Sequence, residues 1–179
     1  MIDALPHVQT PARLPGAFWF ALQTRYQCER KITAQLEEKS IFNFLPLTSA
    51  VHRWSDRTKR IESPLFPGYV FVHLVPRHET RLAVLKTSGV IRFVGTSTEP
   101  VPIPEKQIED LRLVLSNRVP FAEHPFLVAG QRVRIRGGCL HGVEGIWKSV
   151  QQNRSVVISI EPIQRSIVVS LKDYSVEPV

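Results

Sequence analysis

With 179 residues and 43% hydrophobic side chains, the chain can bury the core of one medium-sized domain or of two small ones, which excludes disorder throughout. It carries 23 Lys and Arg against 16 Asp and Glu, and the net charge of +7 suits a polyanionic partner but is too small to require one. The two cysteines, Cys28 and Cys139, are far apart in the sequence. This spacing argues against a disulfide framework and favours a reducing, cytoplasmic compartment.

We expect no membrane segment and no catalytic motif. No apolar run approaches the roughly 18 residues of a membrane span, and the N-terminus lacks the features of a signal peptide. None of the six histidines has a metal-ligand spacing to another histidine or a cysteine. Gly-x-Ser-x-Gly, Walker and dinucleotide-binding motifs are absent from the sequence. The sequence therefore predicts a protein that is not an enzyme and that binds no metal or cofactor.

The chain begins with an arm, a strand and a helix. Residues 1–16 contain several prolines and show no hydrophobic periodicity, which predicts a disordered arm. Residues 18–24 predict a strand that includes Trp19 and Phe20. From 27 to 39, apolar residues recur at helical spacing and predict a helix with one face packed on a sheet.

A basic hairpin is predicted after a further strand at 41–47. Residues 51–61 predict two strands that turn near Ser55 and Asp56. They carry Arg53, Trp54, Arg57, Lys59 and Arg60, a mixture that can contact phosphates and stack on an unpaired base. The alternative is a solvated edge hairpin whose charges prevent aggregation, and composition alone favours this alternative.

The stretch at 64–72 reads Pro-Leu-Phe-Pro-Gly-Tyr-Val-Phe-Val. Its Pro-Gly pair predicts a turn or bulge, and the run that follows is apolar on both faces, as in a central strand. A helix at 77–87, a strand at 90–94 and a helix from Pro104 to Val119 follow. This order predicts an α+β fold with helices packed on a mostly antiparallel sheet.

The C-terminal part predicts a small barrel. The segment 119–128 contains Pro120 and Pro125 and predicts a semi-rigid linker. After it, apolar residues alternate with Arg132, Arg134 and Arg136, so that one face of this strand is cationic and is a candidate RNA-binding face. Several glycines and about five short Val- and Ile-rich strands complete the domain and disfavour helix, so we predict a constitutive barrel.

Three features together resemble the NusG family of transcription elongation factors: the 64–72 stretch, the upstream Trp19 strand and the Gly-rich basic strand, with Gly138 at the central glycine of a KOW motif. The resemblance covers nearly the whole chain after Ala17 and is greatest to the specialised RfaH-like and UpxY-like antiterminators. It implies an NGN domain at 17–118, the linker at 119–128, and a five-stranded SH3-like KOW barrel at 129–179.

The resemblance also implies that the NGN domain binds the clamp helices of RNA polymerase through an aromatic depression, here Trp19, Phe20, Phe66 and Tyr69, and so reduces pausing and termination. An aromatic cluster that faces solvent needs a partner, whereas a buried one is ordinary core, and the sequence leaves both possibilities open. Thr80 and Arg81 occupy the position of an element that contacts the polymerase gate loop, although their segment departs from the family's polar pattern.

Further partners are implied for the hairpin and the barrel. The hairpin would contact upstream or non-template DNA. The charge of the barrel arginines leaves nascent RNA open as their partner instead. Ile163 falls where an aromatic residue of general NusG proteins contacts a ribosomal protein or the Rho terminator, with Arg165 beside it; isoleucine is smaller, so this coupling stays open. We expect a monomer. The alternative function is that of a KOW-type RNA-binding or ribosome-associated structural protein.

Overall fold

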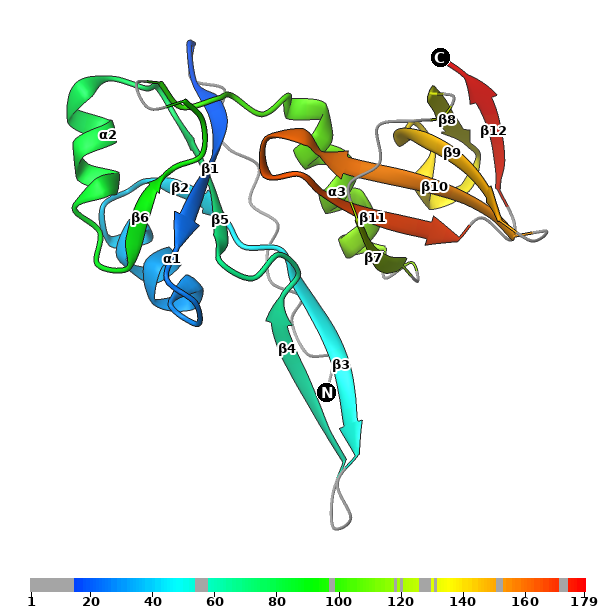
Figure 1. Cartoon of the computed structure of the whole chain (residues 1–179), viewed down its shortest axis with the longest axis horizontal. Coiled ribbons are helices and arrows are strands. Elements are labelled where there is room, and N and C mark those ends of the chain that lie inside the picture. Colours follow the sequence, from blue (N-terminus) through cyan, green and yellow to red (C-terminus); the bar gives the residue numbers. More distant parts are fainter. Residues whose placement is uncertain are drawn as a thin grey trace.

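The computed structural model describes residues 15–53, 58–96, 99–117, 119, 121–125, 130, 132–150, 153–170 and 174–179. This part of the chain forms a four-stranded sheet, a six-stranded sheet and a separate two-stranded ribbon (Figure 1). Within it, no helix is long and apolar enough to cross a membrane, and no three His, Cys, Asp or Glu residues gather in a way that would hold a metal ion.

The N-terminal sheet is antiparallel and has the strand order β2-β5-β1-β6. Its strands are β1 (Phe18–Thr24), β2 (Phe42–Phe44), β5 (Tyr69–Leu74) and β6 (Val90–Phe93). Its helices are α1 (Glu29–Glu38), α2 (His78–Leu85) and α3 (Glu105–Ser116). The predicted α+β sheet with packed helices is therefore confirmed, with the 69–72 run in a central strand.

Both faces of this sheet are covered, which explains why its central strands are apolar on both sides. On one face, Phe20 and Val72 pack with residues of α1 and α2. On the other face, Trp19 and Phe71 belong to a cluster that includes the buried residues of α3. The sheet is thus a middle layer between two helical layers.

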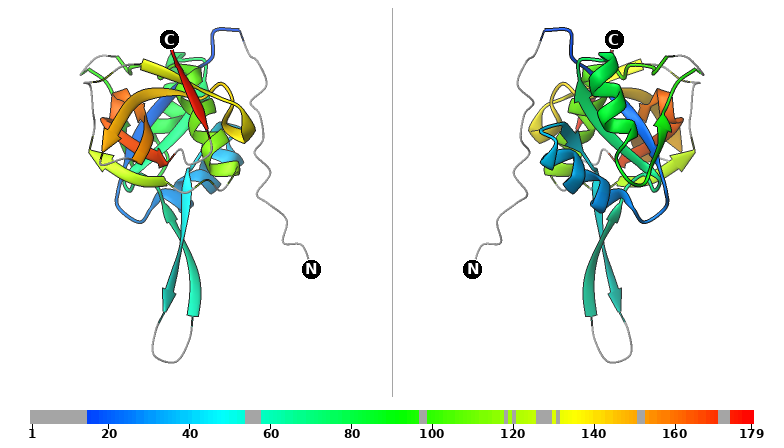
Figure 2. Two further views of the ribbon diagram at one scale, coloured as in Figure 1. Left: turned by 90° about the vertical axis from the view of Figure 1, so that its right-hand side faces the viewer. Right: turned by 90° about the vertical axis from the view of Figure 1, so that its left-hand side faces the viewer.

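The ribbon consists of β3 (Leu47–Arg53) and β4 (Thr58–Pro64). The two strands pair in register from Leu47 opposite Pro64 to Arg53 opposite Thr58. Figures 1 and 2 show that it projects from the body of the molecule as a narrow arm. The predicted hairpin is confirmed over these strands, whereas its predicted turn at Ser55 and Asp56 lies outside the described residues.

The C-terminal sheet has the order β12-β8-β9-β10-β11-β7. The five expected strands are β8 (Arg132–Arg136), β9 (Glu144–Val150), β10 (Asn153–Ile160), β11 (Arg165–Ser170) and β12 (Ser175–Pro178), with short 3-10 turns η1 (Gly138–Leu140) and η2 (Glu161–Ile163). They form an SH3-like domain, and the prediction that this region is β rather than helical is confirmed.

The sixth strand corrects the prediction of a linker at 119–128. Residues Phe121–Pro125 of that segment form β7, which pairs antiparallel with β11 from Phe121 opposite Val169 to Pro125 opposite Arg165. Proline is tolerated here because β7 is an edge strand, where a missing N–H removes no bond from the sheet interior. Phe121 is half-buried against the core, which gives the strand an apolar anchor.

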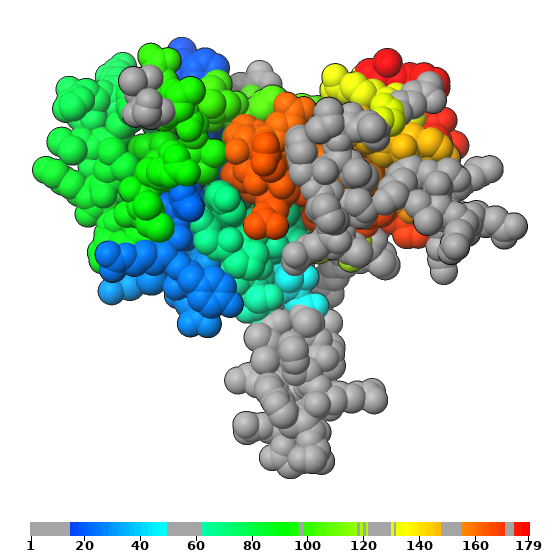
Figure 3. Space-filling model, viewed as in Figure 1, coloured from blue at the N-terminus to red at the C-terminus, as the bar shows by residue number. Residues whose placement is uncertain are grey.

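Helix α3 lies between the two sheets (Figure 1). One continuous hydrophobic cluster runs from Trp19 through α3 residues to barrel residues such as Leu140 and Ile163. In Figure 3 the end of the β10–β11 hairpin, in orange, lies directly against atoms of the N-terminal part, and a hydrogen bond from the Glu161 amide to the Gln107 side chain joins the two at that point. The helix therefore serves both cores.

Candidate functional site

The Pro67-Gly68 turn is held in place by hydrogen bonds from two other elements. The Gly68 N–H donates to Oε1 of Glu29, a carboxylate that is buried at the start of α1, over 2.7 Å. The Thr24 N–H donates to the Gly68 carbonyl over 2.8 Å. Gly68 has φ +82°, a conformation that other residues rarely adopt. The sequence alone does not reveal the role of Glu29, because a carboxylate at a helix N-terminus ordinarily faces solvent.

Aromatic rings gather on the sheet face beside this turn. The ring centroids of Phe66 and Phe71 lie 6.4 Å apart in an edge-to-face arrangement, and those of Trp19 and Phe42 lie 5.8 Å apart in the same arrangement. Phe44 stacks on Phe71 at 6.2 Å. These separations are typical of favourable aromatic pairs, so the face is a packed aromatic layer.

Helix α3 covers this layer with a charged side chain. The Arg112 guanidinium carbon lies 4.9 Å from the Trp19 ring, 5.6 Å from the Phe42 ring and 4.8 Å from the Phe44 ring. Its Nε is buried and makes no hydrogen bond. Burial lowers the pKa of Arg112, against the opposing effect of Glu109 and Glu105. The aromatic face therefore holds a cation through ring contacts.

The four aromatic residues predicted for one depression do not share a face. Trp19 and Phe66, at 2% and 3% exposure, lie in the cluster with α3, whereas Phe20 packs with α1 and α2 on the opposite face. Successive residues of a strand point to opposite sides, so Trp19 and Phe20 had to separate. Tyr69 is half-buried at the edge of the α3 cluster. It is the member of the set that reaches the surface.

Thr80 and Arg81 lie on α2, on the Phe20 side of the sheet. The Thr80 hydroxyl lies 2.6 Å from the Val75 carbonyl and 2.9 Å from the Arg77 carbonyl. This hydroxyl therefore donates to backbone carbonyls that precede its own helix. The pair is thus separate from the aromatic layer under α3.

The basic residues of the hairpin fall on the projecting ribbon. Arg53 ends β3, and Lys59 and Arg60 are near the start of β4. Trp54 and Arg57 lie outside the described residues. The ribbon holds these three cationic positions away from both cores, on the part of the molecule that extends furthest from the N-terminal sheet (Figure 1).

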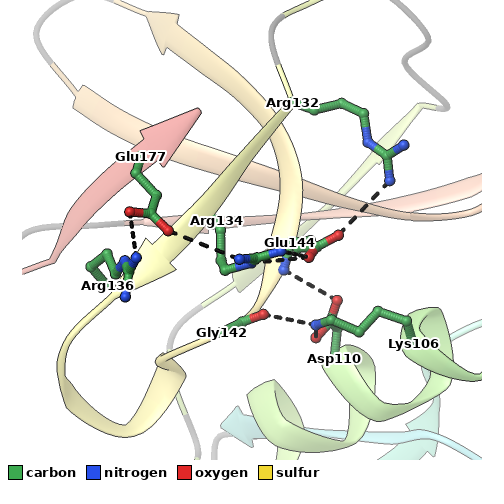
Figure 4. A network of polar contacts seen from close by, with 8 residues as sticks. All are labelled: Lys106, Asp110, Arg132, Arg134, Arg136, Gly142, Glu144 and Glu177. Carbon is green, nitrogen blue, oxygen red and sulfur yellow. Dashed lines mark hydrogen bonds and ion pairs between the residues drawn. The ribbon is translucent and has the colours of Figure 1, made fainter. Parts of the chain in front are cut away.

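The three barrel arginines face two carboxylates. Arg134 contacts Oε1 of Glu144 through two nitrogens, at 3.0 and 2.7 Å, and Arg136 contacts Oε2 of Glu177 at 2.7 Å (Figure 4). Arg132 is 3.9 Å from Glu144 and its side chain is 72% exposed. The hydrogen bonds from Arg134 lower the pKa of Glu144. The predicted cationic face is therefore a mixed-charge face.

These ion pairs were not predicted. Their one signal in the sequence is that each glutamate lies on a strand that pairs with β8. Glu144 and Glu177 stand directly opposite Arg134 on β9 and β12. Opposite charges at such positions stabilise a sheet by up to about 1 kcal/mol. The strand that carries Glu177, β12, is distant from β8 in the sequence, so the alternation of residues within β8 does not reveal that the two strands pair.

A second side of α3 contacts the barrel through polar groups. Lys106 forms an ion pair with Asp110, which is 4% exposed, and its Nζ also donates to the Gly142 carbonyl over 2.8 Å (Figure 4). The Glu144 N–H donates to Oδ2 of Asp110 over 3.2 Å. Burial raises the pKa of Asp110, partly offset by Lys106 and by the Glu144 amide. The predicted packing of the helices on the N-terminal sheet did not include these contacts of α3 with the barrel.

The predicted partner residues of the barrel lie at one corner. Ile163, in η2, is 5% exposed and belongs to the shared hydrophobic cluster. Arg165 is exposed at the first position of β11, opposite Pro125 of β7. Ile163 is thus core in this arrangement, and Arg165 is the surface residue of the pair.

The chain is similar to known proteins by three kinds of comparison: with a family model, with the sequences of curated proteins and with solved structures. The family model described as "Transcription termination factor nusG" matches residues 17–112. The transcription termination/antitermination protein NusG of Lactococcus lactis is 27% identical over 173 residues, covering 90% of this chain and 92% of that protein. The NusG protein of Borreliella burgdorferi is 26% identical over 181 residues, covering 90% and 98%. A solved structure titled "Domain interaction in Thermotoga maritima NusG" matches with a TM-score of 0.53 at 21% identity, covering 89% of this chain and 96% of that one.

Proposed function

We propose, from the premise that this chain belongs to the NusG family, that it is a transcription elongation factor that binds RNA polymerase across the clamp and suppresses pausing and termination. The family model spans residues 17–112 of the 179, more than half of the chain. The curated relatives carry names of termination and antitermination factors. We further propose that the protein acts in the cytoplasm, as a monomer, and on a specific operon.

The observation that carries this proposal is the position of Tyr69. Its ring lies half-buried between the aromatic cluster and the surface, and it directly follows a turn to which Glu29 and Thr24 are hydrogen-bonded. A tyrosine at such a boundary offers an apolar ring and a hydroxyl to a partner at small entropic cost. Tyr69 is therefore the residue of the predicted depression on which we base the polymerase contact.

Other contacts belong to the same proposal. The ribbon would contact upstream or non-template DNA, and Thr80 and Arg81 would add polar contacts to the gate loop. The KOW domain would recruit a ribosomal protein or Rho at the corner that carries Arg165. We take 17–118 as the NGN domain and 129–179 as the KOW domain, with β7 between them.

An assay of pause lifetimes tests the polymerase contact. Wild type, Tyr69→Ala and Tyr26→Ala are added to the cognate core polymerase on its own leader template. Tyr26 is the matched control, because it is 72% exposed and lies outside the aromatic cluster. We expect wild type and Tyr26→Ala to shorten pauses and Tyr69→Ala to lose at least about tenfold of that effect, the consequence of removing a hot-spot aromatic residue.

Two results would contradict the proposal. Wild type that leaves pause lifetimes unchanged would remove the assigned function, and Tyr69→Ala that acts like Tyr26→Ala would remove the assigned surface. Phe66 is unsuitable for this test, because it is 3% exposed and its truncation would destabilise the core by about 3–5 kcal/mol.

The alternative of an RNA-binding structural protein has weaker support. It would need a cationic barrel face, yet Arg134 and Arg136 are paired with glutamates at hydrogen-bonding distance. Their charge is already balanced within the barrel, so phosphate contacts would have to replace these pairs. Arg132 is the arginine of the three best placed to contact RNA.

A further inference from the structure

A row of three side chains crosses the N-terminal sheet beside the Pro67-Gly68 turn. Gln23 on β1 lies opposite Tyr69 on β5 and opposite Arg92 on β6. Residues directly opposite each other on antiparallel strands share one face of the sheet, and Tyr69 packs against the cluster on the α3 face. The row therefore lies on the α3 face, and the backbones of Tyr69 and Arg92 are two strand spacings, about 10 Å, apart.

Helix α3 leaves the β6 end of this face open. In the strand order β2-β5-β1-β6, Arg112 of α3 lies over rings of β1 and β2, towards the opposite edge. Gln23 and Tyr69 are half-buried, and Arg92 is exposed. The pairing of β1 with β6 is irregular at this point and skips Ile91, which is 53% exposed. The open end of the face thus presents an aromatic ring, a cation and an aliphatic side chain.

Gln23 holds the Arg92 guanidinium without neutralising it. The Arg92 Nε donates to Oε1 of Gln23 over 2.8 Å. Because the Gln23 amide is uncharged, this bond orients the guanidinium and leaves its positive charge in full. Among the described residues, no carboxylate forms an ion pair with Arg92, unlike Arg134 and Arg136 of the barrel. With Nε engaged, the two terminal nitrogens remain as the edge that matches the two oxygens of a carboxylate.

We propose that Arg92 determines specificity in the polymerase contact: it binds a carboxylate of RNA polymerase beside the site for Tyr69, and Gln23 positions it. This inference rests on the function proposed above. Tyrosine and arginine are enriched among the residues that dominate the energy of protein interfaces. A guanidinium that is already oriented also loses less side-chain entropy on binding. At about 10 Å from Tyr69, one helix or loop of polymerase can supply both contacts.

The surroundings of Arg92 favour a protein carboxylate over a nucleic-acid phosphate, which a guanidinium also fits. The neighbours of Arg92 on this surface are the exposed Ile91 and the ring of Tyr69, both apolar. Surfaces that bind a nucleic-acid backbone instead gather several cations, because each neutralised phosphate adds to the affinity. The cationic positions of the ribbon lie on a separate element.

The affinity of the full chain for the cognate core polymerase tests the role of Arg92. We expect Arg92→Gln to bind at least about tenfold more weakly than wild type, and Arg92→Glu more weakly still, because it repels a carboxylate. Arg92→Lys should be intermediate, since it keeps the charge but not the paired nitrogens. The matched control is Lys31→Gln, which removes one charge from exposed Lys31 of α1, on the other side of the sheet, and should bind like wild type.

Variants of Gln23 separate positioning from packing. Gln23→Ala should weaken binding several-fold in the wild-type background and have no further effect in the Arg92→Gln background, because the two residues act through one contact. Gln23→Glu keeps an acceptor for the Arg92 Nε but adds a negative charge beside the guanidinium, so it should also weaken binding. A packing role alone would be fulfilled by glutamate. Gln23→Glu that binds like wild type would therefore overturn the assigned role of Gln23.

The outcomes distinguish this inference from the proposed function. Arg92→Gln that binds like wild type, in an assay where Tyr69→Ala has lost affinity, would overturn the inference and leave the polymerase contact standing. Wild type that does not bind polymerase would overturn both. If Arg92→Gln instead leaves polymerase affinity unchanged and makes the salt dependence of duplex DNA binding shallower by about 0.9, Arg92 contacts a phosphate, and the assigned carboxylate is wrong.

Discussion

The guanidinium of Arg112 is the charged group most closely surrounded by aromatic rings in the described part of the chain. Three rings lie within 5.6 Å of it, and its Nε has no hydrogen-bond acceptor. Water is largely replaced by aromatic faces, which attract a cation but do not fully substitute for hydration. Its side chain therefore contributes mainly by filling the space between α3 and the aromatic layer.

Substitutions at Arg112 separate packing from charge. Arg112→Met keeps the apolar stem without the guanidinium, and we expect a free energy of unfolding within about 1 kcal/mol of wild type, because the buried charge is removed along with its ring contacts. Arg112→Ala should lose about 1–3 kcal/mol, because it also removes the packing of the stem. Urea denaturation measures both. A Met variant as unstable as the Ala variant would show that the charge is the stabilising component.

At Asp110, burial and pairing oppose each other. Burial raises the pKa above the ordinary value of 3.8, and the hydrogen bonds from Lys106 and the Glu144 amide act in the opposite direction without cancelling it. The folded protein therefore holds this proton more tightly than the unfolded chain. The stability that this provides is complete below pH 3.8 and is lost as the pH rises through the raised pKa.

Asp110→Asn removes this titration while keeping an oxygen that accepts from the Glu144 amide. The free energy of unfolding of wild type minus that of Asp110→Asn should therefore fall as the pH rises from about 3 towards 7. Urea denaturation of the two proteins at several pH values gives this difference, in which the titration of the groups common to both proteins cancels. A difference that rises with pH would mean that the ion pair with Lys106 outweighs burial.

Among the elements, the β9–β10 pair depends on a residue without a side chain. A Cβ on Gly145 would lie 2.4 Å from the Val157 carbonyl oxygen and 2.4 Å from a Val156 methyl carbon. The carbonyl is backbone and cannot move without shifting the strand. By contrast, a Cβ on Gly137 would meet no atom within 4 Å, although its φ of +82° disfavours other residues.

These two glycines give a matched pair of variants. Gly145→Ala should destabilise the barrel by about 1–3 kcal/mol or more, because it overpacks two strands. Gly137→Ala should cost about 1 kcal/mol, the penalty of a left-handed backbone alone. Chemical denaturation followed by tryptophan fluorescence, to which Trp147 on β9 contributes, compares them. Equal losses would indicate that β9 and β10 adjust to the added methyl group.

For the whole molecule, the distribution of charge separates two kinds of contact. The net charge is +7, and the projecting ribbon carries cationic positions far from the aromatic cluster. Contacts between cations and DNA phosphates weaken with salt, whereas an apolar contact with polymerase changes little. Salt dependence therefore distinguishes the ribbon from the Tyr69 surface.

Neutralising the ribbon tests its contact with DNA. In Arg53→Ser, Lys59→Ser, Arg60→Ser, the slope of log affinity for duplex DNA against log salt should become shallower by about 0.9 for each phosphate that the ribbon no longer neutralises. A control replaces three exposed cations of the N-terminal domain, Arg25, Lys31 and Lys86, with serine. Fluorescence anisotropy over a range of salt concentrations measures the slopes. Equal slopes for the ribbon variant and wild type would exclude the ribbon from DNA contact.

Sequence patterns sufficed wherever structure is local. The run Tyr69 to Val72 is apolar on both faces and forms a central strand, and alternation at Val133 and Ile135 gives a strand with one buried face. The helices begin and end within two or three residues of the predicted limits. In each case the periodicity of 2 or 3.6 residues directly reflects which side is buried.

The candidate site was harder to predict, because its residues depend on partners distant in sequence. Trp19 and Phe20 were placed together, although strand alternation sends them to opposite faces. Arg134 and Arg136 were read as free cations because their partners lie on β9 and β12. A linker was predicted where β7 pairs with β11, since five residues with a proline carry little strand signal of their own.

The sequence by itself determined the set of elements, the order of an α+β sheet and then a small barrel, and the resemblance to the NusG family. It could do so because hydrophobic periodicity and the 64–72 stretch are properties of short segments. The tertiary structure alone decided that α3 has two buried sides, that Asp110 contacts the barrel and that β7 closes the edge of β11. These features arise where two separately folded surfaces meet, and the hydrogen bonds and packing at such a meeting depend on the positions of atoms that no local pattern encodes.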